Sequence, residues 1–137
     1  MGIEDCKAVV RGLVDECVNR DRADLLGQYV ADDVRVHPGT PGSAPDTQGI
    51  DELRTAFRRF HTALPDLHVV LDEVIAEGDL VATRGTATGT HSAELAGVPA
   101  TGRPVRWSGT DVYRIADGRI AEWWRNEDST WLLAQLS

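Results

Sequence analysis

The chain closes with Gly118-Arg-Ile-Ala-Glu-Trp-Trp-Arg-Asn-Glu-Asp128, followed by Ser129-Thr-Trp-Leu-Leu-Ala-Gln-Leu136. If residues 118–128 form a strand, alternate side chains lie on opposite faces. One face then carries Ile120, Glu122, Trp124, Asn126 and Asp128, and the other carries Ala121, Trp123, Arg125 and Glu127. The first face indicates either a strand end in solvent or a pocket wall. We favour the pocket, with Trp124 as its floor and Asp128 as a titratable group in apolar surroundings.

Length and charge limit the class of protein. The 137 residues make a single domain spanning 1–137, which is long enough to bury a core. The net charge of −8, with no basic patch, argues against nucleic acid or an anionic membrane as a partner. No signal peptide or membrane-spanning stretch is visible, so we expect a cytoplasmic protein.

The cysteine content argues against a disulfide and a metal site. Cys6 and Cys17 fall on one predicted helix, about three turns and roughly 16 Å apart, which is too far for a disulfide bond. Neither cysteine belongs to a cluster of Cys and His residues of the kind that holds zinc. We therefore expect two core cysteines and no bound metal.

Apolar periodicity predicts helices first and strands afterwards. A spacing of three and four residues predicts helices over 3–19, 22–30 and 50–63, and the buried stripe of the third includes Phe57. A brief strand is expected over 32–37. Alternation then predicts strands over 67–77, 80–91 and 105–115 before the closing strand, with turns at Gly78-Asp79 and Asp117-Gly118, and a short helix ends the chain. This order is α+β, and a curled sheet covered by the helices would enclose a cone with a hydrophobic pocket inside.

Several motifs, in this order along the chain, carry a resemblance to a known family. They are Gly85-Thr-Ala-Thr-Gly-Thr-His91, Gly97-Val-Pro-Ala-Thr-Gly102, Tyr113-Arg-Ile-Ala-Asp-Gly-Arg-Ile120 and Trp124-x-x-x-Asp128. Together they resemble the SnoaL-like polyketide cyclases, which share a superfamily with ketosteroid isomerase and nuclear transport factor 2. The resemblance implies a cone-shaped α+β barrel that is oligomeric through its outer sheet face. It also implies cofactor-free ring closure by intramolecular aldol condensation, with Asp128 as the acid/base aspartate.

The candidate catalytic residues follow from this reaction. A carboxyl group can take a proton from carbon and return it to oxygen if its pKa is raised, which burial of Asp128 beside Trp124 would do. Asn126 either contacts a substrate carbonyl, orients Asp128 or is a plain strand-end amide. Asp111 is either a second pocket carboxylate, the partner of Arg84, or a surface residue.

The remaining candidates are substrate contacts and two residues with open alternatives. Arg84 either forms an ion pair inside the cone or is a charge on its rim. His37 either lies at the mouth of the pocket or is a loop histidine in water. The expected ligand contacts are Trp107, Tyr113, Trp124, His37 and Phe57. Trp123, on the opposite face from Trp124, is predicted to pack against a second subunit.

The sequence thus favours a polyketide cyclase-type enzyme that uses acid/base chemistry, without a cofactor, on a hydrophobic, carbonyl-rich small molecule. Two alternatives stay open at this point. One is an isomerase or an epoxide hydrolase in the same pocket, because an Arg–Asp arrangement resembles the epoxide hydrolases built on this cone. The other is a binding domain that merely holds an apolar ligand. We expect a homodimer or homotetramer.

Overall fold

The computed structural model describes residues 1–38 and 46–136, in which the helices come mostly before the strands. The helical segments are α1 (Ile3–Gly12), a π-helix continuing it (Leu13–Val18), a 3₁₀ turn (Ala23–Leu25), α2 (Leu26–Tyr29), α3 (Ile50–Ala63) and α4 (Ser129–Gln135). The range predicted for the third helix, 50–63, is confirmed. The helix predicted over roughly 22–30 is confirmed, as a 3₁₀ turn followed by α2, and it ends where β1 begins at Val30.

Six strands form one mixed sheet. They are β1 (Val30–His37), β2 (Thr47–Gln48), β3 (His68–Glu77), β4 (Leu80–Thr90), β5 (Pro104–Ala116) and β6 (Arg119–Trp124). The spatial order is β2-β1-β6-β5-β4-β3, with β1 parallel to β6 and every other pair antiparallel. The predicted α+β class and the meander from β3 to β6 are confirmed. The short strand β2 was not predicted.

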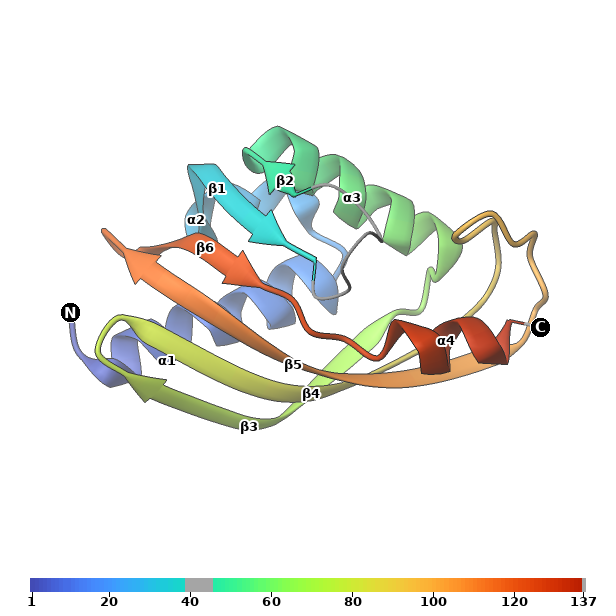
Figure 1. Cartoon of the computed structure of the whole chain (residues 1–137). Coiled ribbons are helices and arrows are strands. Elements are labelled where there is room, and N and C mark those ends of the chain that lie inside the picture. The colour runs from blue at the N-terminus through green and yellow to red at the C-terminus, as the bar shows by residue number, and fades with distance from the viewer. Residues whose placement is uncertain (39–45, 137) are drawn as a thin grey trace.

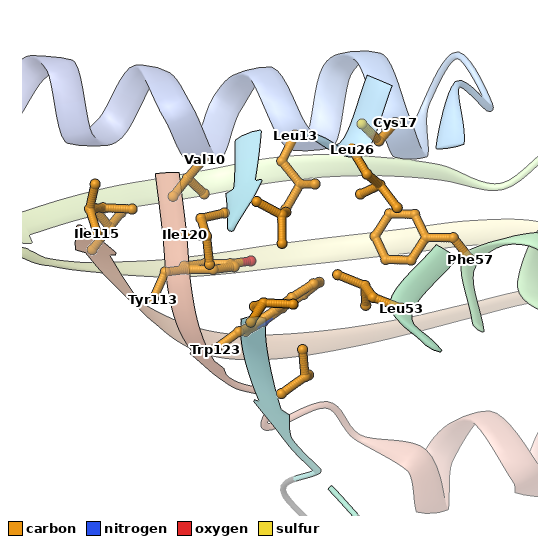
Figure 2. Close-up of a cluster of buried hydrophobic side chains, with 14 of the residues drawn as sticks. Val10, Leu13, Cys17, Leu26, Leu53, Phe57, Tyr113, Ile115, Ile120 and Trp123 are labelled. Atoms are coloured by element: carbon orange, nitrogen blue, oxygen red, sulfur yellow. The ribbon is translucent and has the colours of Figure 1, made fainter. Parts of the chain in front are cut away.

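The helices cover the concave face of the curved sheet (Figure 1). α1 contacts β3 and β4, whereas α3 contacts β1, so the two helices lie over opposite halves of the sheet. Figure 2 shows their buried side chains meeting those of the sheet, with Leu13 and Phe57 from the helices facing Tyr113 and Trp123 from β5 and β6. Burial of this apolar surface stabilises the cone. Both cysteines are buried in this part of the molecule and free.

A β-bulge in β6 exchanges the side chains that point into the core with those that point outward, compared with the sequence prediction. Ile120 pairs with Ile115 of β5, but Glu122 pairs with Arg114, so Ala121 is an extra residue in the ladder. After the bulge the alternation restarts in the opposite sense, which makes Trp123 buried at 6% exposure and leaves Trp124 38% exposed. The predicted assignment of the two tryptophans to the inner and outer faces is therefore wrong.

None of the helices formed by residues 1–38 and 46–136 has the length and apolar content needed to cross a membrane.

Candidate active site

An apolar cavity of about 110 Å³ lies between the concave face of the sheet and the helices. Its lining comes from the π-helix, from α3, and from strands β3 to β6. The apolar walls include Leu13, Val14, Phe57, Phe60, Leu67 and Trp107. Polar side chains enter the cavity from β5 and from the segment that follows β6. A concave apolar space with a few convergent polar groups is the usual form of a small-molecule site.

Asp111 is the carboxylate that β5 places in this cavity. Its Oδ2 accepts a hydrogen bond from the Trp123 indole N–H at 3.1 Å, and the Tyr113 hydroxyl lies 3.5 Å away. Its Oδ1 accepts the backbone N–H of Asn126 at 3.0 Å. Burial raises the pKa of Asp111, and the negative charge of Glu127 raises it further. The group is therefore oriented by donors yet easier to protonate than an ordinary aspartate.

Arg125 and Glu127 face the same cavity, because the bulge in β6 turns odd-numbered residues inward. Their side chains form an ion pair, and the Arg125 guanidinium carbon lies 5.4 Å from the Trp123 ring centroid. Gly109 of β5 makes room for Glu127, since a Cβ atom at position 109 would lie 2.8 Å from the Glu127 Cγ atom. The cavity thus holds two carboxylates and one guanidinium against apolar walls.

Three of the four predicted catalytic residues lie outside this cavity. Asp128, Asn126 and Arg84 line a second, polar groove, which shares Gly85, Ser108, Gly109 and Glu127 with the cavity lining. Asp128 is exposed, and its side chain caps α4 by accepting the Trp131 backbone N–H at 2.9 Å. The prediction that Asp128 is shielded from water beside Trp124 is wrong, because the bulge turns both residues away from the cavity. The Asn126 side chain is likewise exposed.

Arg84 and His37 belong to the outer face of the sheet. Arg84 is paired with Glu73 rather than with a carboxylate inside the cone. His37 stacks on Trp124 with ring centroids 5.6 Å apart. The His37 Nε2 atom lies 2.6 Å from a Glu122 carboxylate oxygen, and this hydrogen bond is the main cause of the raised pKa of His37. The predicted positions of His37 and Trp124 at the pocket are therefore wrong.

The structure does place the other predicted residues in the cavity lining: Asp111, Trp107, Tyr113 and Phe57. Their roles in binding or catalysis stay predictions. Sequence reasoning missed Arg125, Glu127 and Trp123 as site residues because a bulge leaves no clear mark in the sequence. A possible signal was Gly109, a glycine inside an alternating strand, which often marks a close approach by another part of the chain. Among the described residues, no group of three or more His, Cys, Asp or Glu side chains could hold a metal ion.

A cone-shaped α+β fold around an apolar cavity is the fold of the class of proteins built on the ketosteroid isomerase-like cone. Within that class, the chain belongs to the SnoaL-like polyketide cyclase family, whose model matches residues 8–136. No curated protein sequence matches the chain significantly.

Solved structures share this fold over nearly the whole chain. IdmH of Streptomyces antibioticus, assigned as a polyketide cyclase, is 34% identical with a TM-score of 0.81, and the match covers 96% of this chain and 97% of that chain. A protein of Jannaschia sp. CCS1, assigned as a SnoaL-like polyketide cyclase, has a TM-score of 0.89 at 23% identity, with 98% and 93% covered. AclR of Streptomyces galilaeus, assigned as a hydroxylase, has a TM-score of 0.83 at 25% identity, with 98% and 97% covered.

Proposed function

We propose that the protein is a polyketide cyclase-type enzyme that closes a ring by intramolecular aldol condensation, with Asp111 as the acid/base residue. The observation that carries the proposal is one carboxylate, held by three hydrogen-bond donors inside an apolar cavity, with its pKa raised by burial. Family membership and the likeness to IdmH support the reaction class. Asp111 takes the role that the family resemblance had assigned to Asp128.

Proton transfer by Asp111 suffices for the proposed reaction. The ionised carboxylate removes a proton from a substrate carbon flanked by carbonyl groups, and the resulting enolate carbon attacks a second carbonyl carbon of the same molecule. A C–C bond forms, and Asp111 returns its proton to the new alkoxide. The reaction stops at this addition and releases no water, so product and substrate have the same mass, and no cofactor is needed. A raised pKa suits this double role, because the same group must act as base and then as acid.

The lining of the cavity indicates the chemistry of the substrate. Phe57, Phe60 and Trp107 provide aromatic surface, and the titratable groups gather on the β5 side. A hydrophobic, carbonyl-rich molecule would place its apolar body on the rings and its reacting carbon beside Asp111. We therefore propose an uncyclised polyketide ester as the substrate class.

The test is ring closure of such an ester by purified protein, followed by chromatography and mass spectrometry for a product of unchanged mass. We expect the Asp111→Asn variant to lose about a hundredfold or more of the wild-type rate, since it can no longer accept a proton. The Asp128→Asn variant is the matched control and should retain the wild-type rate, because Asp128 lies outside the cavity. Full turnover by Asp111→Asn, or an equal loss in both variants, would refute the assignment.

The ion pair beside Asp111 favours a second candidate function, the hydrolytic opening of an epoxide. Glu127, paired with Arg125, would take a proton from water, and Asp111 would donate its proton to the epoxide oxygen as the C–O bond breaks. The product is a diol, which contains the oxygen of one added water. Diol formation from an aryl epoxide in labelled water, abolished by Glu127→Gln, would support this reading. Ring closure without incorporation of oxygen from the labelled water would support the cyclase.

A further inference from the structure

Arg125 carries an unused hydrogen-bond donor in the cavity lining. Two buried side-chain nitrogens have no hydrogen-bond partner among the described residues, His91 Nε2 and Arg125 Nε. Only Arg125 belongs to the cavity lining. A buried donor without an acceptor is costly, particularly on a charged group, so such atoms usually have a role. The Nε–H of Arg125 is suited to an oxygen that the protein itself does not supply.

The surroundings of Arg125 fix the guanidinium in place. One Nη atom pairs with Glu127, the group lies over the Trp123 ring, and the backbone N–H donates to the His37 carbonyl oxygen at 2.9 Å. Trp123 also holds Asp111 through its indole N–H at 3.1 Å. The proton acceptor and the free donor are therefore positioned by the same tryptophan, and a donor fixed before reaction needs no reorganisation during it.

Proton transfer to Asp111 moves the negative charge onto the substrate, and this is the state that Arg125 would stabilise. Before proton transfer, the negative charge lies on Asp111. After the transfer Asp111 is neutral, and the charge lies on the enolate oxygen of the substrate. The total charge in the cavity is unchanged, but it has moved to an oxygen that needs a donor. A fixed guanidinium N–H binds such an oxyanion more strongly than it binds the neutral carbonyl.

We propose that Arg125 is a further catalytic residue, whose Nε–H donates to the substrate oxygen on which negative charge develops when Asp111 removes the proton. The inference rests on the proposed function and deepens it, since it requires a substrate that forms an enolate. It assigns Asp111 to the carbon and Arg125 to the oxygen of one enolisable carbonyl unit. Glu127 keeps the guanidinium in position.

The test measures binding and needs no substrate. The probe is 4-nitrophenol, whose phenolate oxygen mimics an enolate oxygen, and the control ligand is 4-nitroanisole, which has the same ring but cannot ionise. Titration calorimetry gives both dissociation constants, and the visible absorbance of the phenolate reports the ionised form. We expect the wild-type protein to bind the phenolate about tenfold more tightly than the anisole.

The variant for this test is Arg125→Lys, which keeps the positive charge beside Glu127 but removes the planar Nε–H donor. We expect the phenolate preference to fall below about threefold, with the affinity for 4-nitroanisole unchanged. Asp111→Asn should bind the phenolate more tightly than the wild type does, because it lacks the competing negative charge. Equal affinity of the wild type for the two ligands, an unchanged preference in Arg125→Lys, or weaker phenolate binding in Asp111→Asn would overturn the proposal.

The outcomes separate this inference from the proposed function. The ratio of phenolate to anisole affinity involves no turnover, whereas the role of Asp111 is judged by ring closure. A protein that loses ring closure in Asp111→Asn but shows no phenolate preference would keep the cyclase proposal and reject the role of Arg125. A phenolate preference that depends on Arg125, together with full turnover in Asp111→Asn, would reject the acid/base assignment instead.

Discussion

The negative charge of Glu127 acts on the neighbouring Asp111 carboxyl group, and this predicts a pH effect. Burial raises the pKa of Asp111 first, and the charge of Glu127 raises it further. Since the ionised form is the proposed base, kcat/KM should increase as the pH rises through this pKa. Glu127→Gln removes the charge and leaves Arg125 free to attract Asp111, so both changes lower the pKa.

The measurement is the pH profile of kcat/KM for ring closure by the wild type and Glu127→Gln. We expect the acidic limb of the variant to move to lower pH. Glu73→Gln, on the outer face and paired with Arg84, is the matched control and should leave the limb in place. A limb that stays fixed or moves to higher pH in Glu127→Gln would contradict the electrostatic coupling.

Asp128 has a structural role at the start of α4 that single substitutions can separate from catalysis. Its carboxylate accepts the Trp131 backbone N–H, one of the donors that a helix start leaves unpaired. Asp128→Ala should lower the free energy of unfolding by about 1 kcal/mol, whereas Asp128→Asn should change it little, because asparagine caps helices nearly as well. Urea unfolding measures both values. Equal stability of Asp128→Ala and the wild type would show that the cap contributes nothing.

At the level of elements, β6 shows what the sequence could and could not predict. Its existence, its turn at Asp117-Gly118 and its antiparallel pairing with β5 follow from local signals. Asp-Gly is a hairpin turn signal, both turn residues adopt positive φ, and Ile115 and Ile120 are apolar on either side. The bulge at Ala121 depends on pairing with another strand, which no single stretch encodes. One extra residue exchanged the faces of Trp123 and Trp124, and it likewise turned Glu127 rather than Asp128 toward the cavity.

The remaining parts of the fold divide in the same way. The length of α3 follows from its apolar stripe and from Pro65, which stops a helix. The parallel pairing of β1 with β6 joins residues far apart in the chain. The periodicity of the sequence alone could therefore not predict which strand lies beside β1. The switch from α1 to a π-helix at Leu13 likewise depends on packing, because the apolar spacing continues across it.

The junction between α1 and the π-helix predicts an unusual response to alanine. Alanine in place of glycine normally stabilises a helix by about 1 kcal/mol. At Gly12, however, a Cβ atom would lie 2.2 Å from the Tyr29 Cε1 atom, whereas at Gly27 it would meet nothing within 4 Å. Gly12→Ala should therefore destabilise the protein by about 1–3 kcal/mol. Gly27→Ala should be neutral or stabilising by up to about 1 kcal/mol.

Urea unfolding of the two glycine variants checks this contrast between neighbouring helices. The midpoint of Gly12→Ala should fall and that of Gly27→Ala should stay or rise, at an unchanged slope. If Gly12→Ala is as stable as Gly27→Ala, then Tyr29 can move away without cost and does not fix the junction.

At the scale of the whole molecule, the convex face of the sheet carries an apolar row that crosses four strands. The strand register aligns Ile75 with Ala82, Ala82 with Val112, and Val112 with Trp124. Ile75 is 61% exposed and Trp124 is 38% exposed. Ala82 and Val112, which lie between them, are half-buried. A contiguous and partly exposed apolar row is typical of a surface that another protein covers. We propose a homodimer formed through this face, with Trp124 in the role that the sequence had suggested for Trp123.

This dimer predicts a difference between two exposed tryptophans. Trp124→Ser removes the largest side chain of the apolar row, whereas Trp131→Ser removes an indole that is 41% exposed on α4, outside the row. Size-exclusion chromatography with light scattering over a range of concentrations should give twice the chain mass of 14.9 kDa for the wild type and Trp131→Ser. The dissociation constant of the Trp124→Ser dimer should be roughly a hundredfold higher than that of the wild type, because aromatic anchors often contribute more than 2 kcal/mol to an interface. A monomeric wild type, or equal dissociation of the two variants, would show that this face is not the interface.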